Sequence, residues 1–343
     1  MVSVIIPVYN AQRTIRRCLK SIIDQTFQDI EIVVIDDGST DDSLNIVERM
    51  LQSNDIIVRK PRNEGQEMAR RSGITASHGE FVSFVDADDY LEKDAIEKMV
   101  NAMHSYDADL VQCGSRVFVT CFGFLEIHPR RSKKGGRVRL LGIDNIKKEY
   151  MSFFGCGHFN VTCWGKLYKR DMIENVKTGN LFFGEDLYFN MQIFQRLCSI
   201  CVIPDTLYHY ERQGMTSRFM PDLMNEVKRL YRLKVEKARE MQSDMAFLYS
   251  TIELRNCFKV QVESMILHKA DTADGIKRWI RRELQDSTYD IFGWLSKQRE
   301  GGRSPISQAI TAKDADTIYR LCRQSVYEWK WKKIARRIMV NLS

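Results

Sequence analysis

Short apolar runs alternate with segments of helical periodicity over the first ninety residues. In the first of these segments, Ile15, Leu19 and Ile22 recur every three or four positions, which predicts an amphipathic helix. The runs expected to form strands are 2–8, 31–35, 55–60 and 81–85, and the expected helices are 11–25, a helix through Val47, and 69–77. Short strands alternating with helices predict an α/β fold, in which a mostly parallel sheet is covered by helices on both faces.

Polar residues follow three of these runs directly, at 9–10, 36–37 and 86–89. Ligands of such sheets bind beyond the carboxyl ends of the strands, so the three polar segments are expected in one crevice. Neither the glycine-rich fingerprint of dinucleotide-binding proteins nor a P-loop follows residue 8. The sequence therefore disfavours a nicotinamide-dependent enzyme and a P-loop ATPase.

Three carboxylates end the fourth run, at Asp86, Asp88 and Asp89. Acids placed together after an apolar strand are unfavourable, because like charges repel and each charge resists desolvation. A divalent cation removes that cost, and oxygen ligands at this spacing suit Mg²⁺ or Mn²⁺. The alternative is an acidic turn, in which Asp88 or Asp89 caps a helix that begins near Leu91.

The charge of the chain is unevenly distributed. Residues 1–215 carry 27 Lys and Arg against 29 Asp and Glu, a net charge of −2, whereas residues 216–343 carry 25 against 16, a net charge of +9. From residue 221 the apolar spacing is mainly helical. We therefore expect two domains, 1–215 and a helical, basic 216–343, that meet different partners. The basic part lacks the aromatic and glycine pattern of common RNA-binding modules, so nucleic acid is not an expected partner.

Taken in order, these motifs resemble family 2 glycosyltransferases of the GT-A fold. The likeness covers about the first two thirds of the chain. The matching segments are 4–10, 36–41, 63–65, Ala69-Arg70 with Gly73, 86–89, 164–169, 184–186 and 208–217. The resemblance implies a nucleotide-sugar donor and an inverting transfer of one sugar to a hydroxyl of a saccharide or lipid-linked acceptor, in the synthesis of a cell-surface polysaccharide.

The resemblance also implies which residues hold the donor. Pro7 and Tyr9 would lie against the nucleoside, and Asp36 would accept a hydrogen bond from the base. Arg70 would contact the nucleotide, because a fixed cation suits a ligand that bears phosphates.

Asp86 would face the ribose or the metal, and Asp88 would ligate a Mg²⁺ or Mn²⁺ ion that bridges the diphosphate. Asp186 would be the general base that takes the proton of the acceptor. It precedes an apolar helical face, so it is expected at a helix N-terminus, where the helix dipole favours an ionised carboxylate. The alternative is that Glu185 or Asp186 serves only as a helix cap.

Five further residues, Glu185 among them, are candidates for contacts with the acceptor or the diphosphate. Trp164 and Lys166 resemble an acceptor-side segment of the family, although a core Trp is an alternative for Trp164. His209 and Arg212 could reach the metal or the phosphates. The alternative for His209 is a solvent-facing position on a strand.

Two departures and two rivals bear on this interpretation. Arg71-Ser72 replaces the Asn that more usually follows the family's Ala-Arg, and no Gln-x-x-Arg-Trp segment of processive synthases follows the expected base. The second departure favours one addition per encounter. A sugar-nucleotide pyrophosphorylase and a catalytically silent scaffold are the alternatives. The glycine-rich opening loop of a pyrophosphorylase is missing from this sequence. The intact Asp86, Asp88 and Asp186 disfavour a silent scaffold.

The last helical segment, 324–343, places Tyr327, Trp331, Ile334, Ile338 and Leu342 along one stripe among Lys and Arg side chains. Such a helix either rests on an anionic membrane surface or packs on its own domain. No apolar run approaches the length of a membrane span, a strand begins at residue 2, and nine cysteines show no disulfide framework. We therefore expect a cytoplasmic protein that is peripheral to the membrane if the basic helix binds it.

Overall fold

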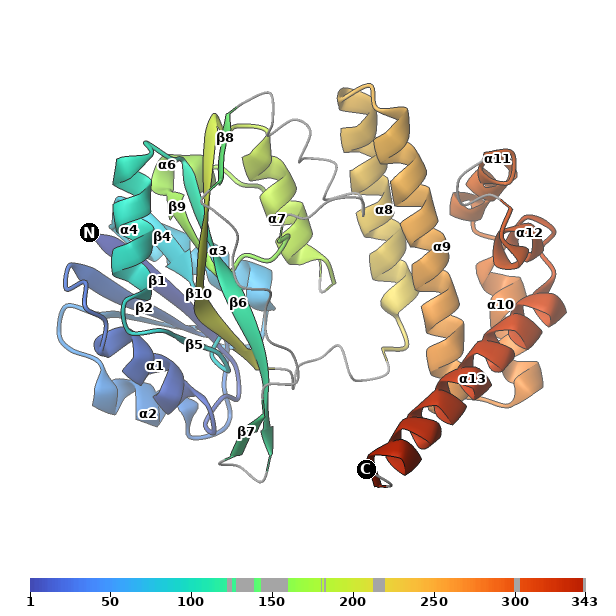
Figure 1. Ribbon diagram of the computed structural model, residues 1–343, viewed down its shortest axis with the longest axis horizontal. Helices are drawn as coiled ribbons and strands as arrows, with labels where there is room; N and C mark the ends of the chain where they lie inside the picture. Colours follow the sequence, from blue (N-terminus) through green and yellow to red (C-terminus); the bar gives the residue numbers. More distant parts are fainter. Residues whose placement is uncertain are drawn as a thin grey trace. The chain divides into compact units, whose positions relative to one another are not determined.

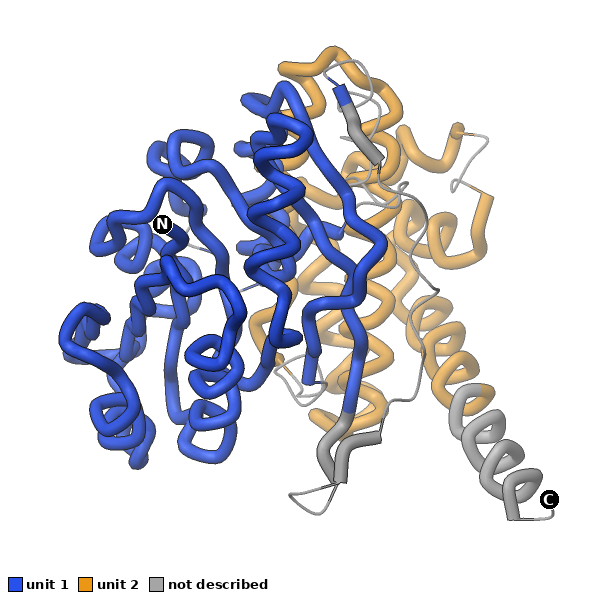
Figure 2. The backbone as a smooth tube through the Cα atoms, turned by 60° about the vertical axis from the view of Figure 1, so that its left-hand side comes forward, with its two compact units in different colours: residues 1–153, 157–217 blue, residues 154–156, 218–343 orange. Residues whose placement is uncertain are grey.

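The computed structural model describes residues 1–121, 125–127, 139–142, 160–179, 181, 183–211, 220–298 and 303–341, and describes side chains outside 119–141 and 329–341. Spatial contacts divide the chain into two compact units, residues 1–153 with 157–217 and residues 154–156 with 218–343 (Figure 2). The division lies close to the expected boundary after residue 215. The assignment of the catalytic role to the first part alone stays a prediction.

A ten-stranded sheet forms the centre of the first unit (Figure 1). Its main path is β3-β2-β1-β4-β9-β6-β10-β5, with β7 beside β6 and β8 beside β10. In chain order the strands are β1 (Val2–Val8), β2 (Ile30–Asp36), β3 (Ile56–Arg59), β4 (Phe81–Phe84), β5 (Tyr90–Leu91), β6 (Leu110–Cys121), β7 (Leu125–Ile127), β8 (Arg139–Gly142), β9 (Lys166–Lys169) and β10 (Ser199–Glu211). The helices of this unit are α1 (Ile15–Ile23), α2 (Ser43–Met50), α3 (Gln66–Ala76), α4 (Ala95–Ser105), α6 (Arg170–Ile173) and α7 (Glu185–Phe194).

The four strands predicted from the first ninety residues lie side by side and parallel, in the order β3-β2-β1-β4. Val8 at the end of β1 is opposite Asp36 at the end of β2, and Ile5 is opposite Phe84 at the end of β4. This register brings the carboxyl ends of the three strands to one edge of the sheet. The predicted shared edge is therefore confirmed.

The remaining strands make the sheet mixed rather than parallel throughout. β9 is antiparallel to β4 and β6, and β10 is antiparallel to β5 and β8 but parallel to β6. Among the described strands, parallel pairing thus covers β3-β2-β1-β4 and the β6–β10 pair. The predicted α/β fold is confirmed, with antiparallel pairing added by the segments after residue 90.

Helix α3 lies unusually close to the sheet. Ile5 of β1 and Ile35 of β2 contact it at Gly73, where an added Cβ would come within 2.3 Å of Ile5 Cγ2. Only glycine permits this approach of helix to strand. Because α3 packs tightly against the centre of the parallel strands, its first two turns are held in a fixed position beside the strand ends.

The segment after β4 contradicts the alternative in which Asp88 or Asp89 caps a helix. Leu91 lies in the short strand β5, which pairs with β10, and the next helix, α4, begins only at Ala95 with Asp94 as its N-cap residue. Asp88 and Asp89 are therefore not the caps of that helix. The apolar Leu91 was a weak guide because it is buried equally well on a strand that joins the sheet edge.

The second unit is helical, as predicted. Its elements are α8 (Leu223–Glu240), α9 (Asp244–Leu267), α10 (Ala273–Glu283), η3 (Ser287–Ile291), α11 (Phe292–Leu295), α12 (Pro305–Thr311) and α13 (Ala315–Asn341). The side chains of Thr272 and Ser304 cap α10 and α12, and Pro305 occupies the first turn of α12. In the part of the chain that the structure describes, none of the helices has the length and apolar character needed to span a membrane.

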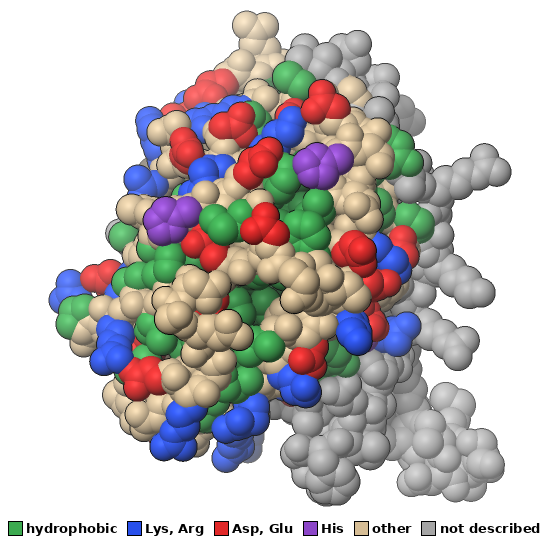
Figure 3. Space-filling view, turned by 90° about the vertical axis from the view of Figure 1, so that its left-hand side faces the viewer, with side chains coloured by type: hydrophobic (Ala, Val, Ile, Leu, Met, Phe, Trp, Pro, Cys, Tyr) green, Lys and Arg blue, Asp and Glu red, His purple; other side chains and the backbone are tan. Residues whose placement is uncertain are grey.

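The molecular face in Figure 3 carries Lys and Arg side chains interspersed with Asp and Glu side chains. Hydrophobic side chains lie between them in small groups. This face therefore presents a mixed charge distribution rather than a broad area of one sign.

Candidate active site

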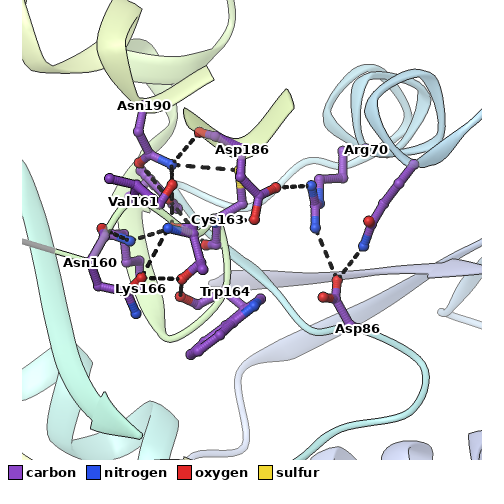
Figure 4. Close-up of polar contacts among 12 residues, drawn as sticks. Arg70, Asp86, Asn160, Val161, Cys163, Trp164, Lys166, Asp186 and Asn190 are labelled. Carbon is purple, nitrogen blue, oxygen red and sulfur yellow. Dashed lines mark hydrogen bonds and ion pairs between the residues drawn. The ribbon is translucent and has the colours of Figure 1, made fainter. Parts of the chain in front are cut away.

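Arg70 joins two carboxylates that belong to distant parts of the chain (Figure 4). Its Nη2 lies 3.0 Å from Asp86 Oδ1, and its Nη1 forms an ion pair with Asp186 Oδ1. The side chain is buried, and burial alone lowers the pKa of a guanidinium. The neighbouring Asp186 and Asp86 nevertheless hold the pKa of Arg70 well above its ordinary value. A permanent positive charge therefore lies between the two acids.

Asp86 follows β4 and is held by α3 and β10. Its Oδ1 also accepts a 2.6 Å hydrogen bond from Gln66 Nε2, and its backbone N–H donates to the Tyr208 hydroxyl at 3.2 Å. Burial raises the pKa of Asp86, with Arg70 opposing that shift. Gln66 and Arg70 are four residues apart, so one face of α3 supplies both contacts.

Asp88 is the second acid of the segment Asp86-Ala87-Asp88, which we call the D-x-D segment. Burial, and then the neighbouring Asp86 carboxylate, raise the pKa of Asp88 to about 6. A cation beside the two acids would remove this repulsion. Among the described residues, no group of three His, Cys, Asp or Glu side chains is arranged to hold a metal. Two carboxylates nevertheless fit Mg²⁺ or Mn²⁺, because such ions take one or two carboxylates and complete their shell with water and ligand phosphates.

Asp89 has a structural position that the sequence did not suggest. It is completely buried, its Oδ2 accepts a 2.6 Å hydrogen bond from the Tyr208 hydroxyl, and its Oδ1 accepts one of 2.7 Å from Glu211 N–H. Arg17 links the same region, because its Nη2 donates to Asp88 O at 2.7 Å and to Glu211 at 2.6 Å. The Asp89 carboxylate therefore holds the D-x-D segment against β10 by these hydrogen bonds.

Asp186 begins α7, as the sequence predicted. Gly184 precedes the helix with φ +79°, a left-handed conformation that favours glycine. Asp186 Oδ2 accepts a 3.1 Å hydrogen bond from Cys163 N–H. Its neighbour Glu185 is half-buried, and burial followed by the Asp186 charge raises the pKa of Glu185 to about 7. Asp186 thus has one oxygen bonded to Arg70 and the other to the backbone of residue 163.

The residues expected around a nucleoside lie at the ends of β1 and β2. Pro7 is buried within β1, and Tyr9, just past its end, is 49% exposed. Asp36 is buried and accepts a 3.2 Å hydrogen bond from Ser39 N–H. The adjacent Asp37 accepts hydrogen bonds from Glu64 and Gly65 N–H groups. Asp37 thus fixes the 63–65 turn, a role that the sequence did not assign.

Trp164 and Lys166 lie near Asp186, but their side chains have different surroundings (Figure 4). The Trp164 indole stacks on Tyr208 and Tyr210, with ring centroids 4.5 and 5.2 Å away. Lys166 is completely buried, and its Nζ donates to Asn160 O at 2.8 Å and to Thr162 O. Burial lowers the pKa of Lys166 to about 8. In this structure its ammonium faces backbone carbonyls rather than solvent, which does not match the expected contact with an acceptor or diphosphate.

His209 is buried, contrary to the solvent-facing alternative. Its ring stacks on Tyr90 at 4.2 Å between centroids, and its Nε2 lies 2.7 Å from Glu92 Oε1. The alternation along β10 failed as a guide because both faces of the strand are covered at this point, so that the consecutive Tyr208 and His209 are both buried. Arg212 lies outside the described residues.

Sequence reasoning missed two polar residues that complete the cluster. Gln66 contacts Asp86, and Asn190 of α7 donates to Asp186 O at 2.8 Å and to Val161 O at 3.0 Å. The four-residue spacings of Gln66 with Arg70 and of Asp186 with Asn190 were available signals, because such residues share one helix face.

Comparison with solved structures defines the class of fold. The crystal structure of Staphylococcus aureus TarS 1-349 in complex with UDP-GlcNAc superposes with a TM-score of 0.64 at 21% sequence identity, covering 95% of this chain and 91% of that one. At this identity the likeness establishes the fold, which is of GT-A type with a helical C-terminal region.

Sequence comparison then gives the family. The model of glycosyl transferase family 2 matches residues 3–176, and the chain belongs to that family. Glycosyltransferase GlyA of Streptococcus pneumoniae serotype 4 is 32% identical over 226 residues, 63% of this chain and 31% of GlyA. The GalNAc(5)-diNAcBac-PP-undecaprenol beta-1,3-glucosyltransferase of Campylobacter jejuni is 28% identical over 188 residues, 54% of this chain and 56% of that protein. The chain thus matches about a third and about half of these two relatives. The resemblance stated from the motifs is confirmed.

Proposed function

We propose that this glycosyltransferase moves one sugar from a nucleotide-sugar donor to a hydroxyl of a saccharide or lipid-linked acceptor, with inversion at the anomeric carbon. The acceptor oxygen forms a bond to the anomeric carbon as its proton passes to the Asp186 carboxylate. The bond from that carbon to the diphosphate oxygen breaks, and its electron pair leaves with the nucleoside diphosphate. A single displacement of this kind needs no protein nucleophile.

One observation carries the proposal: the Arg70 contacts to both Asp86 and Asp186. A donor-side acid and a candidate base, far apart in the sequence, are brought to either side of one buried cation. The reacting carbon of a donor held near Asp86 would then lie within reach of an acceptor oxygen beside Asp186.

Asp86 and Asp88 are the residues that would hold Mg²⁺ or Mn²⁺. When bound there, the ion would supply Lewis-acid stabilisation of the charge that develops on the departing diphosphate. Arg70 is a fixed cation with bidentate geometry, so it would orient the donor phosphates against Asp86. Tyr9, Pro7 and Asp36 would contact the nucleoside at the ends of β1 and β2.

The substrate classes are supported by what the relatives are named for. TarS was crystallised with UDP-GlcNAc, and the Campylobacter relative is named for an undecaprenol-linked acceptor. A nucleotide sugar and a saccharide or lipid-linked acceptor are accordingly the classes that we propose here. Cell-surface polysaccharide synthesis is the process that such substrates serve.

A donor panel tests the proposal. Purified full-length protein is incubated with Mn²⁺ and a set of UDP- and GDP-sugars, and the release of nucleoside diphosphate is measured. We expect turnover with at least one donor, its loss in Asp88→Ala, and loss of transfer with retained donor binding in Asp186→Asn. Full turnover by Asp186→Asn would remove that residue as the base. Release of pyrophosphate instead would favour a pyrophosphorylase.

We also propose that the protein is cytoplasmic and attaches peripherally to an anionic membrane surface through residues 324–343. The net charge of +9 over residues 216–343 and the 56% exposed Tyr327 on α13 support this. The stripe from Trp331 onward lies among residues whose side chains are not described. Co-sedimentation with phosphatidylglycerol vesicles is the test. Equal binding by the full chain and a variant truncated after Cys322 would contradict the proposal.

A further inference from the structure

The loop formed by residues 160–165 touches the candidate base through its backbone. Cys163 N–H donates to Asp186 Oδ2 at 3.1 Å, so the position of this loop bears directly on the Asp186 carboxylate (Figure 4). Gly165 ends the loop with φ +69°, a conformation that favours glycine. Its carbonyl then accepts a 3.0 Å hydrogen bond from Cys113 N–H of β6.

Two completely buried side chains hold the carbonyl groups of this loop. Lys166 Nζ donates to Asn160 O at 2.8 Å and to Thr162 O, and Asn190 Nδ2 donates to Val161 O at 3.0 Å. Asn190 also donates to Asp186 O, which ties the loop to the first turn of α7. The loop is thus clamped from β9 and from the same helix that carries Asp186.

The Tyr168 and Asn160 side chains add further hydrogen bonds to the clamp. The Tyr168 hydroxyl lies 3.1 Å from Cys163 O and 3.2 Å from Asn190 Oδ1. Asn160 Oδ1 accepts from Thr162 N–H at 3.0 Å and from its hydroxyl at 2.8 Å. A buried ammonium is unfavourable unless it is well coordinated, and a fully paired polar network specifies one conformation.

We propose that Lys166 and Asn190 are positioning residues for the reaction, which hold the 160–165 loop so that Cys163 N–H fixes the Asp186 carboxylate in the orientation that receives the acceptor proton. This inference rests on the proposed role of Asp186 as the base. Lys166 was expected to contact an acceptor or the diphosphate; in this proposal it acts through the loop instead. A displaced carboxylate would still allow the donor to bind but would slow the chemical step.

The test compares Lys166→Met and Asn190→Ala with Lys169→Met. Asn190→Ala removes the donor to Val161 O and Asp186 O without removing a buried charge, so it decides the matter if Lys166→Met does not fold. Lys169 lies on the same strand but pairs with Asp107 and Asp109, which makes its substitution a matched control. Calorimetric titration with UDP and Mn²⁺ counts the folded binding sites in each variant.

For Lys166→Met and Asn190→Ala we expect kcat per UDP-binding site, with UDP-GlcNAc as the probe donor, to fall about tenfold or more, while the Kd of UDP changes by about twofold or less. Hydrogen–deuterium exchange should rise in segment 160–166 and stay unchanged in β2. Lys169→Met should match wild type in each measurement.

Wild-type exchange in segment 160–166 of Lys166→Met or Asn190→Ala would overturn the clamp, whatever donor the enzyme uses. Wild-type kcat in either variant would overturn its effect on the reaction. If Asp186 is not the base, Asp186→Asn itself retains turnover. That result distinguishes a failure of the proposed function from a failure of the clamp.

Discussion

Arg70 and Asp186 form an ion pair although 116 residues separate them in the chain. The same guanidinium contacts Asp86, so the acid at the end of β4 and the acid at the start of α7 share one buried cation. Both terminal nitrogen atoms of Arg70 are thus paired with the protein's own carboxylates. A diphosphate at this site would enter a region whose positive charge is already in place.

Arg70→Lys should lower kcat about tenfold or more, because a single ammonium cannot reproduce two directed contacts from a planar guanidinium. The protein should remain folded, since a positive charge still faces both acids. Steady-state turnover of the best donor, together with thermal unfolding, measures both effects. Arg16→Lys, on the exposed side of α1, serves as control and should be neutral. Equal kcat in both variants would contradict the bridging role.

Asp88→Asn should weaken the binding of UDP in the presence of Mn²⁺ by about tenfold or more, because the proposed metal site would lose one of its two carboxylates. Binding of UDP in EDTA should be the same in the variant and in wild type. Isothermal titration calorimetry measures both conditions. Asp24→Asn changes an exposed acid that pairs with Lys20, and it should leave the Mn²⁺ dependence intact.

Gly184→Ala should cost about 1 kcal/mol or more of local stability, since a side chain at φ +79° is strained. Because Gly184 sets the start of α7, kcat should fall as Asp186 is displaced. Gly293→Ala is the matched control, as its added Cβ meets nothing within 4 Å and its φ is ordinary. Turnover and thermal unfolding of the two variants are compared; a normal Gly184→Ala enzyme would show that the turn is not needed.

Lys228→Met should destabilise the second unit most near neutral pH. The buried Lys228 ammonium lies 2.7 Å from Glu283 and 2.9 Å from Asp286, and it holds the pKa of Asp286 well below its ordinary value. A depressed carboxyl pKa adds stability above the unfolded pKa of about 3.9, and this stability is lost as the pH falls through the folded pKa.

Thermal unfolding from pH 3 to pH 8 should therefore show a difference between wild type and Lys228→Met that shrinks below about pH 4. Lys313→Met breaks an exposed pair with Asp290 at 3.4 Å, and should cost less than about 1 kcal/mol at any pH. A constant difference for Lys228→Met across the pH range would show that lost packing, not charge, is the cause.

The parallel half of the sheet was predictable because its determinants are local. Continuous apolar runs such as 2–8 form strands buried on both faces, and the polar residues after them must then lie at the strand ends. Asp186 at the start of α7 was predictable for a similar reason, since the apolar helical face begins directly after it.

The sequence misled where a local pattern has more than one tertiary solution. In the sequence, Asp89 and Leu91 fit a helix cap and the first apolar residue of that helix. In the structure β10 lies beside them: Tyr208 donates a hydrogen bond to Asp89, and Leu91 pairs with β10 as part of a strand. Lys166 was expected to contact an acceptor or the diphosphate, and the alternative for His209 was a solvent-facing position; both side chains are buried with polar partners. Burial of such groups depends on neighbours far away in the chain, which periodicity does not encode.

The sequence by itself thus determined the family, the α/β architecture and the acids that end β4 and begin α7. The tertiary structure alone decided that Arg70 joins those acids, that Asp89 fastens β10 and that Lys166 holds a loop against Asp186. The physical reason is the range of the interactions. Strand and helix formation follows from residues a few positions apart, whereas charged side chains are paired by the packing of segments that the fold brings together.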